Sequence, residues 1–222
     1  MKASSVRVEG KNFREFCGKP LFRWILDTLL EVQEIDQIVI NTDARHILAE
    51  NGLIETDRIT IRDRKSEICG DHVSMNLVLA DDVANVPADF YLMTHTTNPL
   101  MSANTIRNAL VAFQAAKSEG KADSLFTVDK VQTRFYRADC SAVNHDPDNL
   151  IPTQDLEPWF EENSNLYIFT EESFATTLAR IGRKPMMFQS PNFESIDIDT
   201  PADWDFAVVA AKYLQAQAGV GQ

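Results

Sequence analysis

The sequence predicts an α/β fold in which a mostly parallel sheet carries helices on both faces. Short apolar runs, typical of buried strands, alternate along the chain with segments of helical periodicity. The apolar runs at 38–40 and 89–94 end in polar residues, as expected where ligands bind at the carboxyl ends of strands. The 222 residues, 44% of them apolar, are enough for one domain with a core, so 1–222 is predicted to be a single domain.

The first half of the chain is predicted to alternate helix and strand. Apolar residues recur on one helical face over 22–32, and Pro20 precedes this segment at a position that favours proline. Ile38 to Ile40 form a buried strand that ends in Asn41, Thr42 and Asp43. The remaining elements of this half are a short helix at 45–51, a possible strand at 59–61, a helix at 74–83 and a strand at 89–94.

The second half is predicted to contain an inserted lobe. A helix at 102–117, with Ser102 as its cap, and a strand at 124–128 continue the alternation. Residues from about 130 to 163 are polar, contain prolines and lack periodicity, so they are interpreted as an insertion. The predicted elements after it are strands at 165–170, 186–189 and 196–199 and helices at 171–180 and 201–217.

Composition excludes several classes of protein. The formal net charge of −12 argues against a general nucleic-acid binder, and no apolar run approaches the length of a membrane span. The first dozen residues are polar and charged, so we expect no secretory signal. Cys17, Cys69 and Cys140 are odd in number and widely spaced, which favours a reducing, cytoplasmic location over a disulfide framework.

The first 24 residues are cationic although the whole chain is acidic. They contain six basic residues against Glu9 and Glu15. Small residues let backbone N–H groups approach an anion, and cations neutralise it, so this segment could bind a small polyanion. A solvated terminus explains the charge about equally well. The segment does not match the P-loop pattern.

Other residues at predicted strand ends could carry chemistry. On a strand, Asp197 and Asp199 would share one face, where two carboxylates suit Mg²⁺; a solvent-facing edge strand is the alternative. Arg64 and Ser74 could hold a nucleotide, although an ordinary ion pair and a helix cap are better explanations of isolated residues. His95 follows a strand and is either a substrate contact or structural. No GxSxG motif supports a hydrolase.

Six motifs in order resemble the CMP-sialic acid synthetase (acylneuraminate cytidylyltransferase) family. KASSVRVEGKN followed by GKPL is similar to the family's opening motif, A-R-G-G-S-K-R-I-P-x-K-N and G-K-P-L. The other five are INTDA, RKSEICGDHVS, THTTNPL, ENSNLYIF and IDIDTPADW, which resemble S-T-D, R-P-x-x-L-x-x-D-x-x-S, Q-P-T-S-P-L, N-G-x-x-Y and I-D-I-D-x-P-E-D-L. The resemblance covers essentially the whole chain.

This resemblance implies an enzyme with a Rossmann-like nucleotidyltransferase sheet. It would move CMP from CTP to an acidic acceptor, such as a sialic-acid-like 2-keto sugar acid, and release pyrophosphate. The lobe at about 130–163 would be the dimerisation element of a homodimer. The implied site residues are Arg7 and Lys11 on the triphosphate as catalytic cations, Lys2, Ala3, Ser4, Ser5, Asn12, Arg64 and Ser74 at the nucleotide, His95, Asn163 and Tyr167 at the acceptor, and Asp197 and Asp199 on Mg²⁺.

The chain departs from the family pattern at three places. His95 stands where the family has glutamine, and Ser164 where it has glycine, so the acceptor could be a nonulosonic acid, another 2-keto sugar acid or a phosphonate. The family also has an apolar strand before its opening motif, and Met1 falls inside that motif. We therefore expect a sheet without its first strand, and favour a start upstream over a lost element. A non-catalytic nucleotide or sugar-acid binding relative is the alternative.

Overall fold

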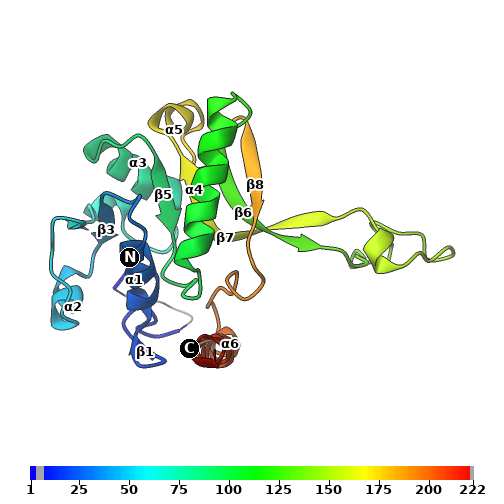
Figure 1. The fold of residues 1–222 in the computed structure, drawn as a ribbon, viewed down its shortest axis with the longest axis horizontal. Coiled ribbons are helices and arrows are strands. Elements are labelled where there is room, and N and C mark those ends of the chain that lie inside the picture. Colours follow the sequence, from blue (N-terminus) through cyan, green and yellow to red (C-terminus); the bar gives the residue numbers. More distant parts are fainter. Residues whose placement is uncertain (4–7, 221–222) are drawn as a thin grey trace.

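The computed structural model describes residues 1–3 and 8–220 (Figure 1). The strands of this described part form three groups. The first is a hairpin of β1 (Glu15–Phe16) and β2 (Lys19–Pro20). The second pairs β3 (Ile38–Thr42) with β4 (Ile59–Asp63) in parallel. The third is a four-stranded sheet in the order β5 (Tyr91–Thr94), β7 (Trp159–Phe169), β6 (Ser124–Val131) and β8 (Pro185–Gln189).

The strand directions agree with the predicted mostly parallel sheet. β8 runs parallel to β6, whereas β7 runs antiparallel to both β5 and β6. Within the four-stranded sheet, β7 is therefore the one strand that opposes the others. It is also longer than the predicted strand at 165–170, because its first residues, from Trp159, pair with the extended end of β6 at Val131.

Six α-helices accompany these strands in the described residues. Ser102 caps α4 as predicted, since its side chain accepts the backbone N–H of Thr105 at 3.1 Å. α5 is shorter than the predicted helix at 171–180, because Leu178 takes a left-handed conformation with φ of 53°. Their bounds are α1 Leu21–Glu31, α2 Arg45–Glu50, α3 Met75–Asn85, α4 Ala103–Ser118, α5 Glu171–Thr177 and α6 Pro201–Val220, with short 3₁₀ turns at Ser66–Ile68 and Thr153–Asp155.

Helices cover both faces of the four-stranded sheet, and successive side chains of β7 pack against helices on opposite faces. Leu166 and Ile168 join the core formed with α1 and α4, the helix that crosses in front of the sheet in Figure 1. Tyr167 and Phe169 point to the opposite face and pack with apolar residues of α3 and α5. Successive side chains of a strand lie on opposite faces, so each face of β7 needs its own cover. None of the helices in the described residues is long and apolar enough to cross a membrane.

A slot separates β3 from β5, and no strand of the described residues occupies it. The slot belongs to a cavity of about 1,480 Å³, whose lining here includes the edges of both strands and apolar side chains of α1 and α3. The amino group of Met1 lies at one end of the slot and donates to the backbone carbonyl of Asn41 at the carboxyl end of β3. The described chain thus agrees with the expected sheet lacking one strand.

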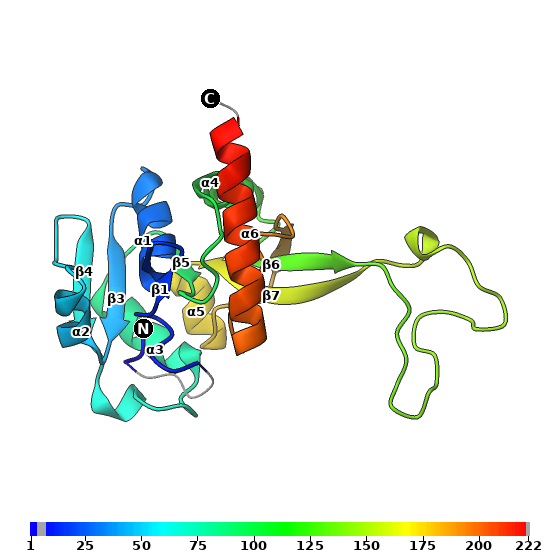
Figure 2. The same ribbon diagram turned by 90° about the horizontal axis from the view of Figure 1, so that it is seen from below.

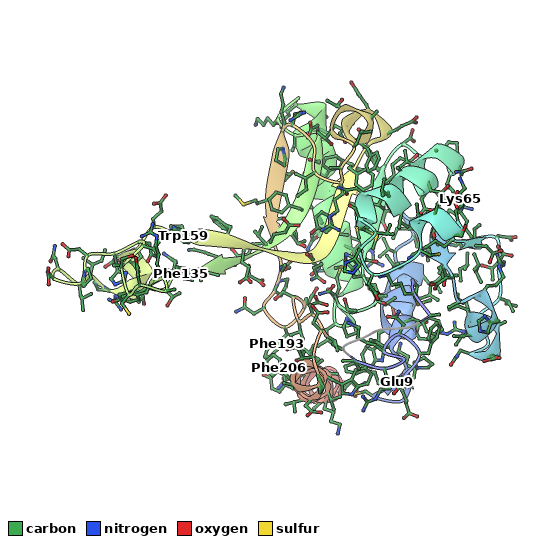
Figure 3. The ribbon with its side chains drawn as sticks, turned by 180° about the vertical axis from the view of Figure 1, so that it is seen from behind. Glu9, Lys65, Phe135, Trp159, Phe193 and Phe206 are labelled. Atoms are coloured by element: carbon green, nitrogen blue, oxygen red, sulfur yellow. The ribbon has the colours of Figure 1, made fainter. Side chains whose placement is uncertain are left out.

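The inserted lobe projects from the body as an arm between β6 and β7 (Figures 1 and 2). The predicted lobe at 130–163 overlaps it, but both ends of that range belong to these two strands. The rings of Phe135 and Trp159 stack at a centroid distance of 5.0 Å in the arm, where Figure 3 labels them. This aromatic contact stabilises the conformation of the arm, whose sequence lacks helical periodicity.

Candidate active site

The carboxyl ends of β3 and β5 open onto one end of the 1,480 Å³ cavity. The N-terminal segment and the chain at 197–199 line the same end. Parallel strands end at a common edge, so residues far apart in sequence meet there. Of the predicted site residues, Lys2, Lys11, Asn12, Arg64, His95, Asp197 and Asp199 line this cavity.

Hydrogen bonds tie the start of the chain to the strand ends. The backbone N–H of Ala3 donates to Oδ1 of Asp43 at 2.7 Å, next to β3. Asn12 donates from Nδ2 to the carbonyl of Lys2 at 3.0 Å and accepts at Oδ1 from the hydroxyl of Thr96 at 2.6 Å, beyond β5. Asn12 thereby holds the N-terminal segment across the cavity mouth. The predicted site residues Ser4, Ser5 and Arg7 lie outside the described residues.

Lys11 reaches the segment that carries the two aspartates. Its ammonium lies 3.3 Å from Oδ1 of Asp199 and also donates to the backbone carbonyl of Ile198, while its side chain is only 8% exposed. A buried lysine needs such partners, because removing an ammonium from water is costly. The structure therefore joins the predicted triphosphate cation and the predicted metal ligand, which are 188 positions apart in the chain.

The segment 196–199 is not a strand, which corrects the sequence-based expectation. It is held instead by the backbone N–H of Ile198, which donates to the carbonyl of Thr97 at 2.9 Å. Asp203 accepts the backbone N–H groups of Asp199 at 3.1 Å and Thr200 at 2.7 Å, and its own N–H donates to the Thr200 hydroxyl. This is a capping box, and the Thr200 hydroxyl also donates to the Asp203 carboxylate at 2.9 Å; that bond, followed by the one from the Thr200 backbone N–H, lowers the pKa of the Asp203 carboxyl.

Asp203 is a positioning residue that the sequence analysis missed. Its signal was present in TPAD at 200–203, since a hydroxyl residue three positions before an acidic residue is a capping-box pattern. The alternating carboxylates at 196–199 predicted a strand, although four residues are too few for periodicity to separate a strand from a fixed loop.

The pair Asp197 and Asp199 fits a partial magnesium site. Within residues 1–3 and 8–220, no group of three or more potential metal-ligating side chains is found. Mg²⁺ needs no such group, because it takes one or two carboxylates and completes its shell with water and phosphate oxygens of a substrate. The donors are oxygen only, and the aspartates line the cavity near Lys11.

Arg64 and Ser74 differ in what the structure supports. Arg64 lines the cavity and is held at β3, because it donates to Oδ1 and the carbonyl of Asn41 at 2.9 and 2.8 Å. Ser74 does not line the cavity and caps α3, accepting the backbone N–H of Asn76 at 3.3 Å. The contacts of Ser74 are therefore those of a helix cap, which was the alternative to a nucleotide contact.

His95 is neutral at the pH of most cells. It lies partly buried beyond β5, and burial followed by the positive charge of Arg180 lowers its pKa from 6.5 to about 4. A neutral imidazole can donate a hydrogen bond from one nitrogen and accept at the other, which suits contact with a hydroxyl-rich ligand. The position thus offers a polar contact without a second permanent cation beside Arg180.

Replacing His95 with asparagine is expected to flatten the acid side of the stability profile. The unfolded chain takes up a proton near pH 6.5 whereas folded His95 resists it until about pH 4, so wild-type stability falls as the pH drops through that window. At about 1.4 kcal/mol per pKa unit, the variant should lose about 2–3 kcal/mol less than wild type between neutral pH and pH 4. Urea unfolding across pH measures this. Parallel profiles for the two proteins would contradict it.

The two other predicted acceptor residues lie behind the cavity wall. Tyr167 is fully buried, and burial, followed by its hydrogen bond to Glu162, raises its pKa to about 12. Asn163 donates to Oδ1 of Asp129 at 3.2 Å and to the Ser190 hydroxyl at 2.7 Å. Neither residue lines the cavity, and the polar groups of both are hydrogen-bonded within the protein.

Ser164 occupies the cavity wall that these two residues flank. It lines the cavity, accepts a hydrogen bond from the Tyr167 hydroxyl at 3.2 Å, and has a φ of 56°. This left-handed conformation favours glycine, which is what the resembled motif carries here. Serine adds a hydroxyl to the wall at the cost of some backbone strain.

A family model described as Cytidylyltransferase matches residues 1–210. The chain is 27% identical to CMP-N,N′-diacetyllegionaminic acid synthase of Legionella pneumophila over 91% of this chain and 90% of that protein. It is 21% identical to pseudaminic acid cytidylyltransferase of Campylobacter jejuni, covering 95% and 93%. Two solved structures share the fold. They are 4-diphosphocytidyl-2C-methyl-D-erythritol synthase of Anaerococcus prevotii (TM-score 0.64, 16% identity, 96% and 95% covered) and CMP:2-keto-3-deoxy-manno-octonic acid synthetase complexed with CTP (0.62, 15%, 97% and 96%).

Proposed function

Because the chain belongs to the cytidylyltransferase family, we propose that it transfers CMP from CTP to a sialic-acid-like 2-keto sugar acid and releases pyrophosphate. The observation that carries this proposal is the single cavity at which Lys11 and the Asp197–Asp199 segment meet the wall formed by His95 and Ser164. The names of the two sequence relatives, which refer to legionaminic and pseudaminic acids, support an acceptor of this class.

The reaction is a nucleotidyl transfer at the α-phosphorus of CTP. The acceptor hydroxyl oxygen forms a bond to that phosphorus, the bond to the bridging oxygen of pyrophosphate breaks, and the hydroxyl proton leaves to solvent. Such transfers depend on positioning and on neutralising charge, with no covalent enzyme intermediate required. Lys11 supplies a buried positive charge, and Arg64, fixed on Asn41, supplies a second at the cavity edge.

Asp197 and Asp199 are proposed to hold Mg²⁺ together with the triphosphate. A bound divalent cation would stabilise the charge that develops on phosphate oxygens. The protein would hold the two carboxylates in fixed positions, because hydrogen bonds to Asp203 and Thr97 fix the backbone of their segment. Lys11, whose ammonium lies 3.3 Å from Asp199, would then contact the phosphates beside the proposed metal ligands.

The arm is proposed to dimerise with the arm of a second copy of the chain. Large apolar side chains are exposed along it, among them Tyr136, Leu150, Ile151, Trp159 and Phe160. Exposed apolar groups on a projecting element are typical of an interface. A solution mass of two chains of 25.0 kDa supports the proposal, and a mass of one chain contradicts it.

Pyrophosphate release tests the proposed reaction. The protein is incubated with CTP, Mg²⁺ and, in turn, N,N′-diacetyllegionaminic acid, pseudaminic acid and 2-keto-3-deoxy-manno-octonic acid. Release is expected with at least one acid, and is expected to stop when Mg²⁺ is chelated or CTP is replaced by UTP. A folded protein that binds CTP but releases no pyrophosphate with any acid would favour the non-catalytic relative. A phosphonate in the same panel separates the other acceptor class.

A further inference from the structure

Arg180 stands at the acceptor wall of the cavity with its guanidinium fixed in place. It follows α5, lines the cavity, and is about one-fifth exposed. The guanidinium carbon lies 3.9 Å from the ring centroid of Tyr167. Its backbone N–H donates to Oδ1 of Asn76 at 3.4 Å, and one terminal nitrogen lies 3.7 Å from the Met93 sulfur. Stacking on a buried ring orients the planar fork at little entropic cost.

The positive charge of Arg180 is only loosely paired with Glu162. The nearest nitrogen–oxygen distance between them is 3.6 Å, longer than a hydrogen bond, and the same Glu162 oxygen accepts the Tyr167 hydroxyl. Arg180 also acts on His95, whose pKa its charge helps to lower. The guanidinium is therefore a largely desolvated cation whose field reaches into the cavity, and an anionic ligand would complete its pairing.

The cations of the cavity divide into two groups. Lys11 contacts the segment of the paired aspartates, and Lys2 and Arg64 lie with Asp71 and Asn41 near the end of β3. Arg180 contacts a different set of residues, on β5 and β7. A triphosphate held by the first group leaves Arg180 to a second ligand.

We propose that Arg180 binds the carboxylate of the acceptor and so selects acids over neutral sugars. This inference rests on the proposed function, because it assigns the acceptor to this wall. A guanidinium matches a carboxylate with two parallel N–H donors, whereas a neutral amide would leave one donor without an acceptor. Ser164 and neutral His95 would then contact hydroxyl groups of the same ligand.

The test compares binding of each acid with binding of its carboxamide. Calorimetry measures the three acids named above, and their C1 amides, against the wild-type chain and the variants Arg180→Gln, Arg180→Lys and Arg183→Gln. Arg180→Gln should weaken binding of the preferred acid about 100-fold, while binding of the amide and of CTP changes little. Arg180→Lys, which keeps the charge but not the fork, should weaken it about tenfold. Arg183, which is exposed and outside the cavity lining, should have no effect.

Each outcome separates a binding role from a structural one. Equal loss of acid and amide binding in Arg180→Gln would mean that the residue shapes the wall only, and unchanged acid binding would overturn the inference. The inference would also be overturned if none of the three acids bound to the wild-type protein. Thermal midpoints confirm that each variant is folded, with Arg180→Lys as the milder change. Acid binding that depends on Arg180 but without pyrophosphate release would remove the proposed reaction and leave this inference standing.

Discussion

Asp199→Asn is expected to lower the rate of CTP-dependent pyrophosphate release on the order of 100- to 1,000-fold, the usual cost of removing one preorganised electrostatic group. Asparagine keeps the shape of the side chain but lacks the charge that would hold Mg²⁺. It also replaces the carboxylate 3.3 Å from the Lys11 ammonium with a neutral amide, so this buried cation would lose a charged partner. Initial rates at saturating CTP and acceptor, over a range of Mg²⁺ concentrations, measure the effect.

The matched control for this variant is Asp205→Asn. Asp205 is exposed on α6, six positions along the chain, and does not line the cavity. Its replacement changes the net charge by the same amount and should leave the rate unchanged. Full activity of Asp199→Asn would overturn the metal assignment. A thermal midpoint near that of wild type excludes unfolding as the cause of a lost rate.

An apolar strand joined to Met1 is expected to raise the free energy of unfolding by several kcal/mol. The slot between β3 and β5 is lined by apolar side chains from α1 and α3. About six isoleucine, valine and alanine residues, at ~3.3 Å each, would match the five residues of β3 and could pair with both strand edges. Burying each branched side chain contributes about 1.5–3 kcal/mol, similar to the cost of ordering that residue. The net gain then comes from the backbone hydrogen bonds to both strand edges, at about 0.5–1.5 kcal/mol each.

The burial of the Met1 amino group is a second reason to expect that an extended chain has a higher free energy of unfolding. Burial, followed by the positive charge of Arg64, lowers the pKa of its amino group from 8.0 to about 5, so the ammonium form is disfavoured where it lies. A peptide bond at this point carries no charge, although it still offers an N–H to the Asn41 carbonyl. Lengthening the chain would therefore remove the cost of burying an amino group at this point.

Urea unfolding of two extended chains measures this gain. The control extension has the same length and apolar content but carries proline at alternate positions, which cannot donate to a strand pair. Only the first extension should raise the urea midpoint and the slope, because only it adds buried surface to the cooperative unit. Equal midpoints for both extensions and the original chain would contradict strand insertion.

The helices and most strands could be predicted because their signals are local. Ser102 before a periodic segment predicts the start of α4, and the run at 38–40 predicts β3, since each pattern is complete within a few residues. The strand at 196–199 was predicted wrongly for the opposite reason. Its conformation depends on Thr97 and Asp203, and alternation of four residues does not reveal such contacts.

The candidate site was predictable in part. The N-terminal segment and the aspartate pair were found as motifs, and the structure brings Lys11 to Asp199. Arg180 left no signal, because nothing in its neighbours along the chain indicates that it stacks on Tyr167. Ser74 and Asn163 were predicted from motifs, yet neither lines the cavity. Their side chains form hydrogen bonds with other groups of the protein instead.

By itself, the sequence determined the order of helices and strands, the cationic opening on an acidic chain and the membership of a family. These properties are carried by spacing and composition, which folding does not alter. Only the tertiary structure decided which charges meet. Lys11 and Asp199 are 188 positions apart, and Arg180 is 85 positions from His95. These charges are placed by tertiary contacts: Thr97 and Asp203 fix the segment that carries Asp199, and stacking on Tyr167 fixes Arg180. Neither kind of contact can be read from the spacing of residues along the chain.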